Sequence, residues 1–125
     1  MRLLLDTHIY LWWLANSPRL SPAAANLISA ADHVYVSSAS FWELSIKTAL
    51  GKLNVNLEEL IDQLAVNQFF PLPVAARHVI RLSSLPYLHK DPFDRMLVAQ
   101  AEAERLRLLT SDHLLAEYSS VVEFV

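Results

Sequence analysis

Four acidic residues, Asp6, Glu43, Asp94 and Asp112, stand where helices and strands are expected to begin or end. Aspartate is depleted in strands, so the strand propensity of the preceding residues 3–5 does not account for Asp6. Carboxylates gathered in a chain without cysteine and without a paired-histidine motif form a hard oxygen site, which prefers Mg²⁺ or Mn²⁺ to zinc. Such an ion lowers the pKa of a bound water and neutralises charge on a phosphate. The chemistry implied is hydrolysis of a phosphodiester by metal-activated water.

Each of these acids also has an ordinary structural explanation. Asp6 can cap the following helix through its side chain. Glu43 stands three residues after Ser40, a spacing that matches a capping box. Crowded carboxylates repel one another, which raises some of their pKa values or destabilises the fold unless a cation binds. The functional interpretation therefore depends on whether the fold brings the acids together.

The elements expected to position the acids alternate between strand and helix. Strands are predicted at residues 2–5, 34–36, 69–72, 106–110 and 121–125, and helices at residues 9–14, 22–31, 41–50, 57–66, 75–82, 94–105 and 113–118. This alternation predicts an α/β protein, a three-layer α/β/α fold with a central parallel sheet of four to five strands. The first strand is expected at the centre of the sheet. Ligands of such sheets bind at the carboxyl ends of the strands, where Asp6 and Asp112 would lie.

Composition narrows the class of protein. The 125 residues fit one domain, 1–125, and 54% hydrophobic residues can fill its core. The absence of cysteine excludes a disulfide framework, a thiolate zinc site and a cysteine nucleophile, and is compatible with the expected cytoplasmic location. A single glycine, Gly51, argues against a phosphate-cradling glycine-rich loop. No signal peptide and no apolar run of about 20 residues is visible, so no membrane association is expected.

The net charge of −3 is not that of a typical nucleic-acid-binding protein. Setting aside the four candidate metal ligands leaves 9 of the 13 acids against 10 basic residues. The remaining surface is then nearly neutral, so a nucleic-acid substrate is compatible with the composition.

Four stretches of the sequence resemble the signature blocks of PIN domains: Asp6-Thr7 after the first strand, Ser40-x-x-Glu43, residues 94–99, and Thr110-Ser111-Asp112. Residues 40–47, 51–53 and 89–95 further resemble the VapC-type toxins of bacterial toxin–antitoxin pairs. The resemblance runs from Arg2 to about Tyr118. It implies a Mg²⁺- or Mn²⁺-dependent endoribonuclease that acts on RNA as a toxin. It also implies a small antitoxin protein that covers the site, and frequent homodimerisation.

The resemblance assigns catalytic and metal-binding roles by position to Asp6, Glu43, Asp94 and Asp112. Asp91 matches an acid that is common in this subgroup, but a turn and helix-capping role before Pro92 explains it equally well.

Other polar residues are secondary candidates. Thr7 and Ser111 can orient a carboxylate or a metal-bound water, although both are ordinary turn and cap residues. The candidates for contacts with the RNA backbone are Lys47, Lys52 and Arg95. Lys47 also lies four residues from Glu43, which suits a surface ion pair.

Aromatic rings and histidines are expected to have other roles. His8 and His89 are not expected to bind metal. The aromatic residues expected in the core or at an interface rather than as stacking platforms are Trp12, Trp13, Trp42 and Phe93. Residues 9–27 are predicted to contribute an apolar surface to partner binding, a prediction that fails if they are buried within the chain.

Two non-catalytic alternatives remain. A receiver-like signalling module would also bind Mg²⁺ in an acidic pocket, but it needs a phosphorylatable aspartate at the end of the third strand, where Pro71-Leu72-Pro73 stands. A PIN-like protein that only binds a partner would not need the intact set of acids.

Overall fold

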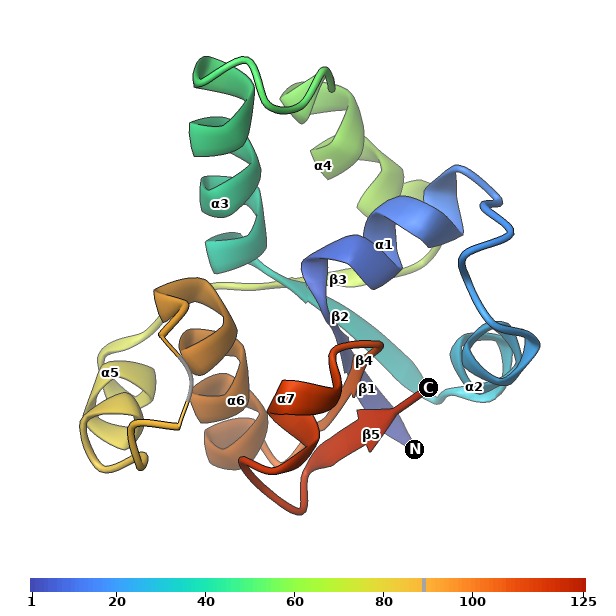
Figure 1. The fold of residues 1–125 in the computed structure, drawn as a ribbon. Helices are drawn as coiled ribbons and strands as arrows, with labels where there is room; N and C mark the ends of the chain where they lie inside the picture. Colours follow the sequence, from blue (N-terminus) through green and yellow to red (C-terminus); the bar gives the residue numbers. More distant parts are fainter. Residues whose placement is uncertain (89) are drawn as a thin grey trace.

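The computed structural model describes residues 1–88 and 90–125, so the prediction made for His89 lies outside the described residues. Among them, five parallel strands form one sheet in the order β3-β2-β1-β4-β5 (Figure 1). The strands are β1 (Arg2–Leu5), β2 (His33–Ser37), β3 (Phe70–Leu72), β4 (Arg107–Thr110) and β5 (Val122–Phe124). The predicted parallel α/β sheet, with the first strand at its centre, is confirmed.

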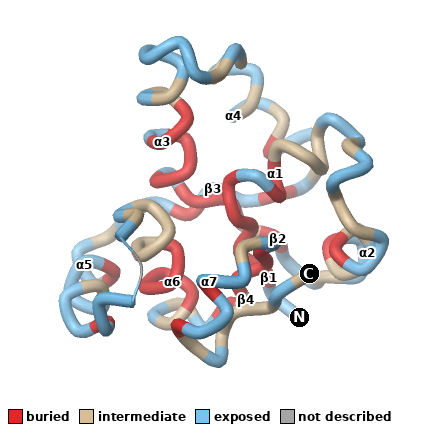
Figure 2. Tube along the Cα trace, in the orientation of Figure 1, coloured by how far each residue is buried: buried red, intermediate tan, exposed pale blue. Residues whose placement is uncertain are grey.

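Helices pack on both faces of the sheet (Figure 1). They are α1 (Thr7–Leu14), α2 (Pro22–Ala30), α3 (Ser38–Ala49), α4 (Leu57–Val66), α5 (Ala76–Ser83), α6 (Pro92–Glu104) and α7 (His113–Ala116). Side chains alternate between the two faces of a strand, so Leu3 and Leu5 join one core while Leu4 joins the other. The first core includes Ile9 of α1 and the second includes Leu97 of α6. Figure 2 shows buried residues along the central strands and on the helices beside them. The three residues of β1 that precede Asp6, Leu3 to Leu5, are fully buried.

The start of α3 differs from the prediction. Ser37 is the N-cap and its hydroxyl accepts a hydrogen bond from the Ala39 backbone at 3.0 Å. Ser37 is the last residue of β2 and the helix begins at the next residue, Ser38. Ser40 therefore lies inside α3, and the predicted capping box with Glu43 is wrong.

Helix α6 also begins earlier than predicted. Asp91 is its N-cap and accepts hydrogen bonds from the backbone of Phe93 at 2.8 Å and of Asp94 at 3.1 Å, while Pro92 occupies the first helical position. Asp94 thus stands in the first turn rather than opening the helix. The end of α3 follows the prediction, because Gly51 has a φ of 72°, which a glycine adopts without steric cost.

In the described part of the chain, no helix has both the length and the apolar character needed to cross a membrane.

Candidate active site

Five acids line one pocket of about 450 Å³ beside the carboxyl ends of β1 and β4: Asp6, Glu43, Asp91, Asp94 and Asp112. They come from four parts of the fold. Asp6 follows β1, Glu43 projects from α3, Asp91 and Asp94 belong to the start of α6, and Asp112 follows β4. The structure therefore gathers all four predicted acids, together with Asp91, around one space.

Asp6 is held in place by hydrogen bonds to the neighbouring strand β4. Its backbone N–H donates to the Leu109 carbonyl at 3.0 Å, and the Thr110 hydroxyl donates to its Oδ2 at 2.7 Å. Asp6 occupies the N-cap position of α1, yet its side chain makes no capping hydrogen bond. Capping therefore does not explain this side chain. Burial raises the pKa of Asp6, against the lowering effects of the Thr110 hydrogen bond and of His8.

Thr110 also links Asp6 to Asp112. Its hydroxyl oxygen accepts a hydrogen bond from the Asp112 backbone at 3.0 Å. The Asp112 carboxylate caps α7 by accepting from the Leu114 backbone at 3.0 Å. One buried hydroxyl thus fixes the exits of β1 and β4 relative to each other.

Glu43 is oriented through both of its oxygens. Its Oε1 accepts from the Thr7 hydroxyl at 3.0 Å, and Thr7 in turn lies 2.8 Å from the Ser40 hydroxyl. Its Oε2 pairs with the Lys47 ammonium at 2.9 Å. Glu43 is 5% exposed, and a buried carboxylate needs such partners. Ser40 therefore supports Glu43 through Thr7 rather than through a helix cap.

The charges of the other four acids of the pocket all act on Asp94. Its pKa is raised to about 8, first by burial and then by the negative charges of Asp6, Asp91, Glu43 and Asp112. Like charges that crowd one another disfavour the ionised form of each. Strong repulsion at an acidic pocket is the electrostatic condition that a bound cation relieves.

The chemistry of these side chains fits a divalent cation with hard oxygen preference. Within residues 1–88 and 90–125, no three acids or histidines already stand as a complete set of ligands around one ion. Mg²⁺ demands oxygens at about 2.0–2.1 Å. The carboxylates must therefore rotate about their side-chain bonds to reach this geometry. The oxygen donors and the repulsion among the carboxylates favour binding of a cation.

The secondary candidates separate into two groups. Ser111 and Lys47 line the acidic pocket, as do His8 and His113. Lys52 and Arg95 are not among the residues that line it. The Arg95 guanidinium lies 4.8 Å from the centre of the Tyr87 ring, and its Nε donates to the Tyr118 hydroxyl at 3.0 Å. Of the predicted RNA contacts, only Lys47 faces the acids.

Sequence reasoning missed two supporting residues and one cation. Thr110 and Ser40 belong to the recognised blocks, but their roles depend on contacts between distant elements. Arg19, from the loop between α1 and α2, also lines the acidic pocket, and no local pattern marks it.

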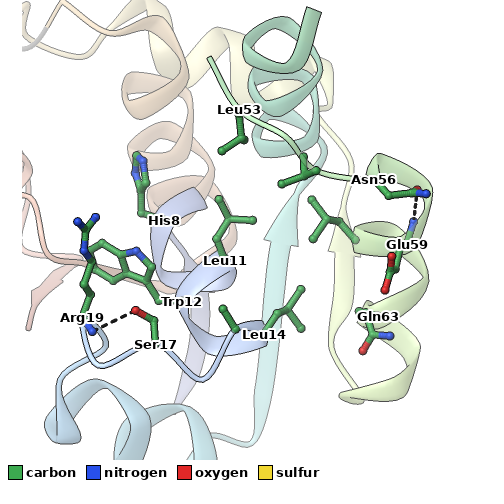
Figure 3. A pocket seen from close by; sticks show the side chains of 13 residues that line it. His8, Leu11, Trp12, Leu14, Ser17, Arg19, Leu53, Asn56, Glu59 and Gln63 are labelled. Carbon is green, nitrogen blue, oxygen red and sulfur yellow. Dashed lines mark hydrogen bonds between the residues drawn. The ribbon is translucent and has the colours of Figure 1, made fainter. Parts of the chain in front are cut away.

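A second, larger space adjoins the acidic pocket. This groove of about 910 Å³ lies between α1 and α4 (Figure 3). It shares His8, Trp12 and Arg19 with the acidic pocket. Its apolar lining includes Leu11, Leu14, Leu53, Val55 and Leu60. Ile9 and Tyr10 are buried inside the chain, so the predicted apolar surface of residues 9–27 is reduced to the outer side of α1.

The tryptophans occupy different environments. Trp13 packs against Phe69 with ring centroids 6.0 Å apart and donates to the Asn67 side chain at 3.0 Å. Trp42 is 63% exposed and contacts Phe93 edge to face, with centroids 5.0 Å apart. Trp13 is therefore a packing residue, whereas Trp42 presents a ring to the surface.

The fold and the site together define an α/β protein with a parallel sheet and a pocket of carboxylates at its strand ends, which is where ligands of such sheets bind. The family model of the PIN domain matches residues 3–120. The chain is 35% identical over 122 residues to Ribonuclease VapC22 of Mycobacterium tuberculosis, a match that covers 92% of this chain and 90% of that protein. This chain belongs to the PIN domain family.

Solved structures show the same fold. VapBC2 from Rickettsia felis, bound to a DNA fragment from its promoter, superposes with a TM-score of 0.71 at 16% identity, covering 99% of this chain and 98% of that chain. FitAcB from Neisseria gonorrhoeae gives a TM-score of 0.70 at 19% identity, covering 98% and 96%. A toxin–antitoxin complex from Klebsiella pneumoniae gives 0.67 at 20% identity, covering 97% and 95%.

Proposed function

We propose that this protein is a metal-dependent endoribonuclease and the toxin of a toxin–antitoxin pair. The observation that carries the proposal is the single pocket lined by five acids from four parts of the fold, in which the pKa of Asp94 is raised to about 8. The ribonuclease name of the similar mycobacterial protein and the toxin–antitoxin complexes among the similar structures support it.

The residues proposed to hold Mg²⁺ or Mn²⁺ are Asp6, Glu43, Asp94 and Asp112, with Asp91 as a further candidate. When bound, such an ion supplies an activated water and neutralises charge on the phosphate. Thr110 positions Asp6, while Thr7 and Lys47 position Glu43. Ser111 lines the same space and is proposed to orient a carboxylate or water there. The Lys47 ammonium stands where it can also meet the phosphate of an RNA substrate.

An antitoxin is proposed to bind the groove between α1 and α4. The groove offers apolar side chains such as Leu11 and Leu53 and opens beside the acids. A chain that fills it would also cover the entrance to the acidic pocket, because the two spaces share lining residues. Binding and inhibition would then be a single event.

A second copy of this chain is proposed to pack on the outer face of α3. Trp42 and Ile46 of that helix and Leu50 at its C-cap follow one another at intervals of four residues, and all three are exposed. Exposed apolar stripes of this kind are typical of association surfaces. Light scattering of the wild type and of Ile46→Lys would test it, with a dimer expected for the first and a monomer for the second.

Cleavage of cellular RNA in vitro tests the proposed function. We expect total bacterial RNA to be cut in Mg²⁺ or Mn²⁺, to remain intact in EDTA, and to remain intact with Asp6→Asn. Asp62→Asn, which removes an exposed acid on α4, is the matched control and should cut RNA normally. Since the substrate is RNA, we place the activity in the cytoplasm. Full activity of Asp6→Asn would refute the site.

A further inference from the structure

Arg19 stands at the junction of the two spaces. Its side chain lines both the acidic pocket and the groove between α1 and α4. Figure 3 shows its guanidinium on the side of the groove formed by Trp12 and His8, opposite Asn56, Glu59 and Gln63. A nucleic-acid strand that leaves the acids toward the groove would pass this guanidinium.

The loop that carries Arg19 is tied to α1. The Ser17 backbone donates to the Trp12 carbonyl at 2.9 Å, the Leu20 backbone donates to the Ser17 carbonyl at 3.1 Å, and the Arg19 backbone donates to the Ser17 hydroxyl at 3.1 Å. Helix α1 begins directly after Asp6. The backbone of Arg19 is therefore fixed relative to the acid that anchors the site.

The charges around the acidic pocket set Arg19 apart from Lys47. Both cations line the pocket, but the Lys47 ammonium is engaged with Glu43 at 2.9 Å. Among the ion pairs of the described residues, none involves Arg19. Within the described residues, the charge of Arg19 is therefore not used in a salt bridge. A guanidinium also offers several donors in a plane, which match two phosphate oxygens.

We propose that Arg19 binds the phosphate of the nucleotide next to the scissile phosphodiester, on the groove side of the acids. This assignment rests on the proposed ribonuclease function and extends it by naming a residue that positions the substrate. Phosphate contacts fix the register of a strand without reading its sequence. Arg19 therefore contributes to substrate affinity and placement, while the acids contribute to the chemical step.

Binding of RNA in the absence of cleavage is the direct test. The probe is a fluorescein-labelled single-stranded RNA 20-mer of random sequence, followed by anisotropy in EDTA at several KCl concentrations. Arg19→Ala is expected to raise the Kd about tenfold and to make the slope of log K against log salt less negative by about 0.7, the value for one lost contact on a single strand. Arg19→Lys keeps the charge but not the planar pair of donors, so it should restore the wild-type salt slope and recover only part of the lost affinity.

Two further measurements complete the design. With total bacterial RNA and Mg²⁺, Arg19→Ala should raise KM about tenfold and leave kcat within about twofold, as expected for a phosphate contact made equally in the ground and transition states. Arg77→Ala removes a solvent-exposed arginine of α5 that lines neither space, and it should change neither Kd nor KM.

Several outcomes would overturn the assignment. They are an unchanged Kd and salt slope for Arg19→Ala, a salt slope for Arg19→Lys that equals that of the alanine variant, or a fall in kcat with KM unchanged. Loss of affinity only for a co-expressed antitoxin, with RNA binding intact, would assign Arg19 to the protein partner instead. Because the anisotropy needs no cleavage, its result is independent of whether the wild type cuts RNA.

Discussion

Replacing Asp94 with asparagine should stabilise the metal-free protein at alkaline pH. The folded chain raises the pKa of this carboxyl from 3.8 to about 8, so the folded state binds a proton more tightly than the unfolded state does. Stability is then highest below about pH 4 with respect to this group and falls as the pH rises toward 8. Asparagine has no proton to lose, so the variant lacks this pH-dependent loss.

The magnitude follows from the same difference. At about 1.36 kcal/mol per pKa unit, a difference of about four units sets an upper bound of roughly 6 kcal/mol. Asp94 is only partly buried, and solvent screening reduces this figure to roughly 1–3 kcal/mol. For a chain of this length, that corresponds to an increase in Tm of roughly 4–15 °C at pH 8.5.

Thermal unfolding followed by circular dichroism in EDTA would measure the effect between pH 5.5 and 8.5. The difference in Tm between Asp94→Asn and the wild type should grow with pH, and Asp62→Asn should show no such trend. Saturating Mg²⁺ should raise the Tm of the wild type and reverse the order of the two proteins, because a ligand that binds only the folded state stabilises it. A difference that stays constant with pH would refute the account of charge crowding around Asp94.

Three other residues give separate predictions. Thr110→Val removes the hydroxyl shared by Asp6 and Asp112, so metal affinity and RNA cleavage should fall about 10- to 100-fold. The control Thr48→Val loses a hydrogen bond within α3 and should cleave RNA normally. Equal cleavage rates for the two variants would contradict the role of Thr110 in joining Asp6 to Asp112. Glu104, which accepts from Arg77 and His78, has its pKa lowered to about 2. In urea unfolding at pH 6, Glu104→Gln should therefore have a lower free energy of unfolding than the wild type, and this difference should shrink from pH 4.5 toward 2. A difference that persists at pH 2 would contradict the pairing of Glu104 with Arg77 and His78. Tyr10 donates to the Leu60 carbonyl at 2.6 Å, and burial raises its pKa to about 12; Tyr10→Phe should lose about 1 kcal/mol of unfolding free energy, which an unchanged urea midpoint would exclude.

The sequence predicts the fold well because its strands and helices have strong local signals. The buried run before Asp6, the capping serine and proline at the start of α2, and Gly51 after α3 each act over a few neighbouring residues. The order of the strands then follows from right-handed crossovers between parallel strands. The starts of helices are predicted less accurately, since Ser37, Ser38 and Ser40 all suit an N-cap and no local signal selects among them.

The acids of the candidate site can be predicted from the sequence, but the residues that support them cannot. The convergence of Asp6 and Asp112 at one edge follows from the parallel sheet, and the structure places both on one pocket. The Thr110 and Thr7 hydrogen bonds join residues that are far apart in the chain. Arg19 reaches the pocket from a loop, where neither periodicity nor a motif indicates which way a side chain points.

The most direct test of the central claim compares metal binding with RNA cleavage in the same protein. Mn²⁺ binding is measured by calorimetry, and cleavage of total bacterial RNA is measured over the same Mn²⁺ concentrations, for the wild type, Asp6→Asn and Asp62→Asn. We expect binding and cleavage to saturate together in the wild type and in Asp62→Asn, and both to be lost in Asp6→Asn. Cleavage that persists in EDTA, or Mn²⁺ binding that is unchanged in Asp6→Asn, would contradict a metal-dependent site built on these acids.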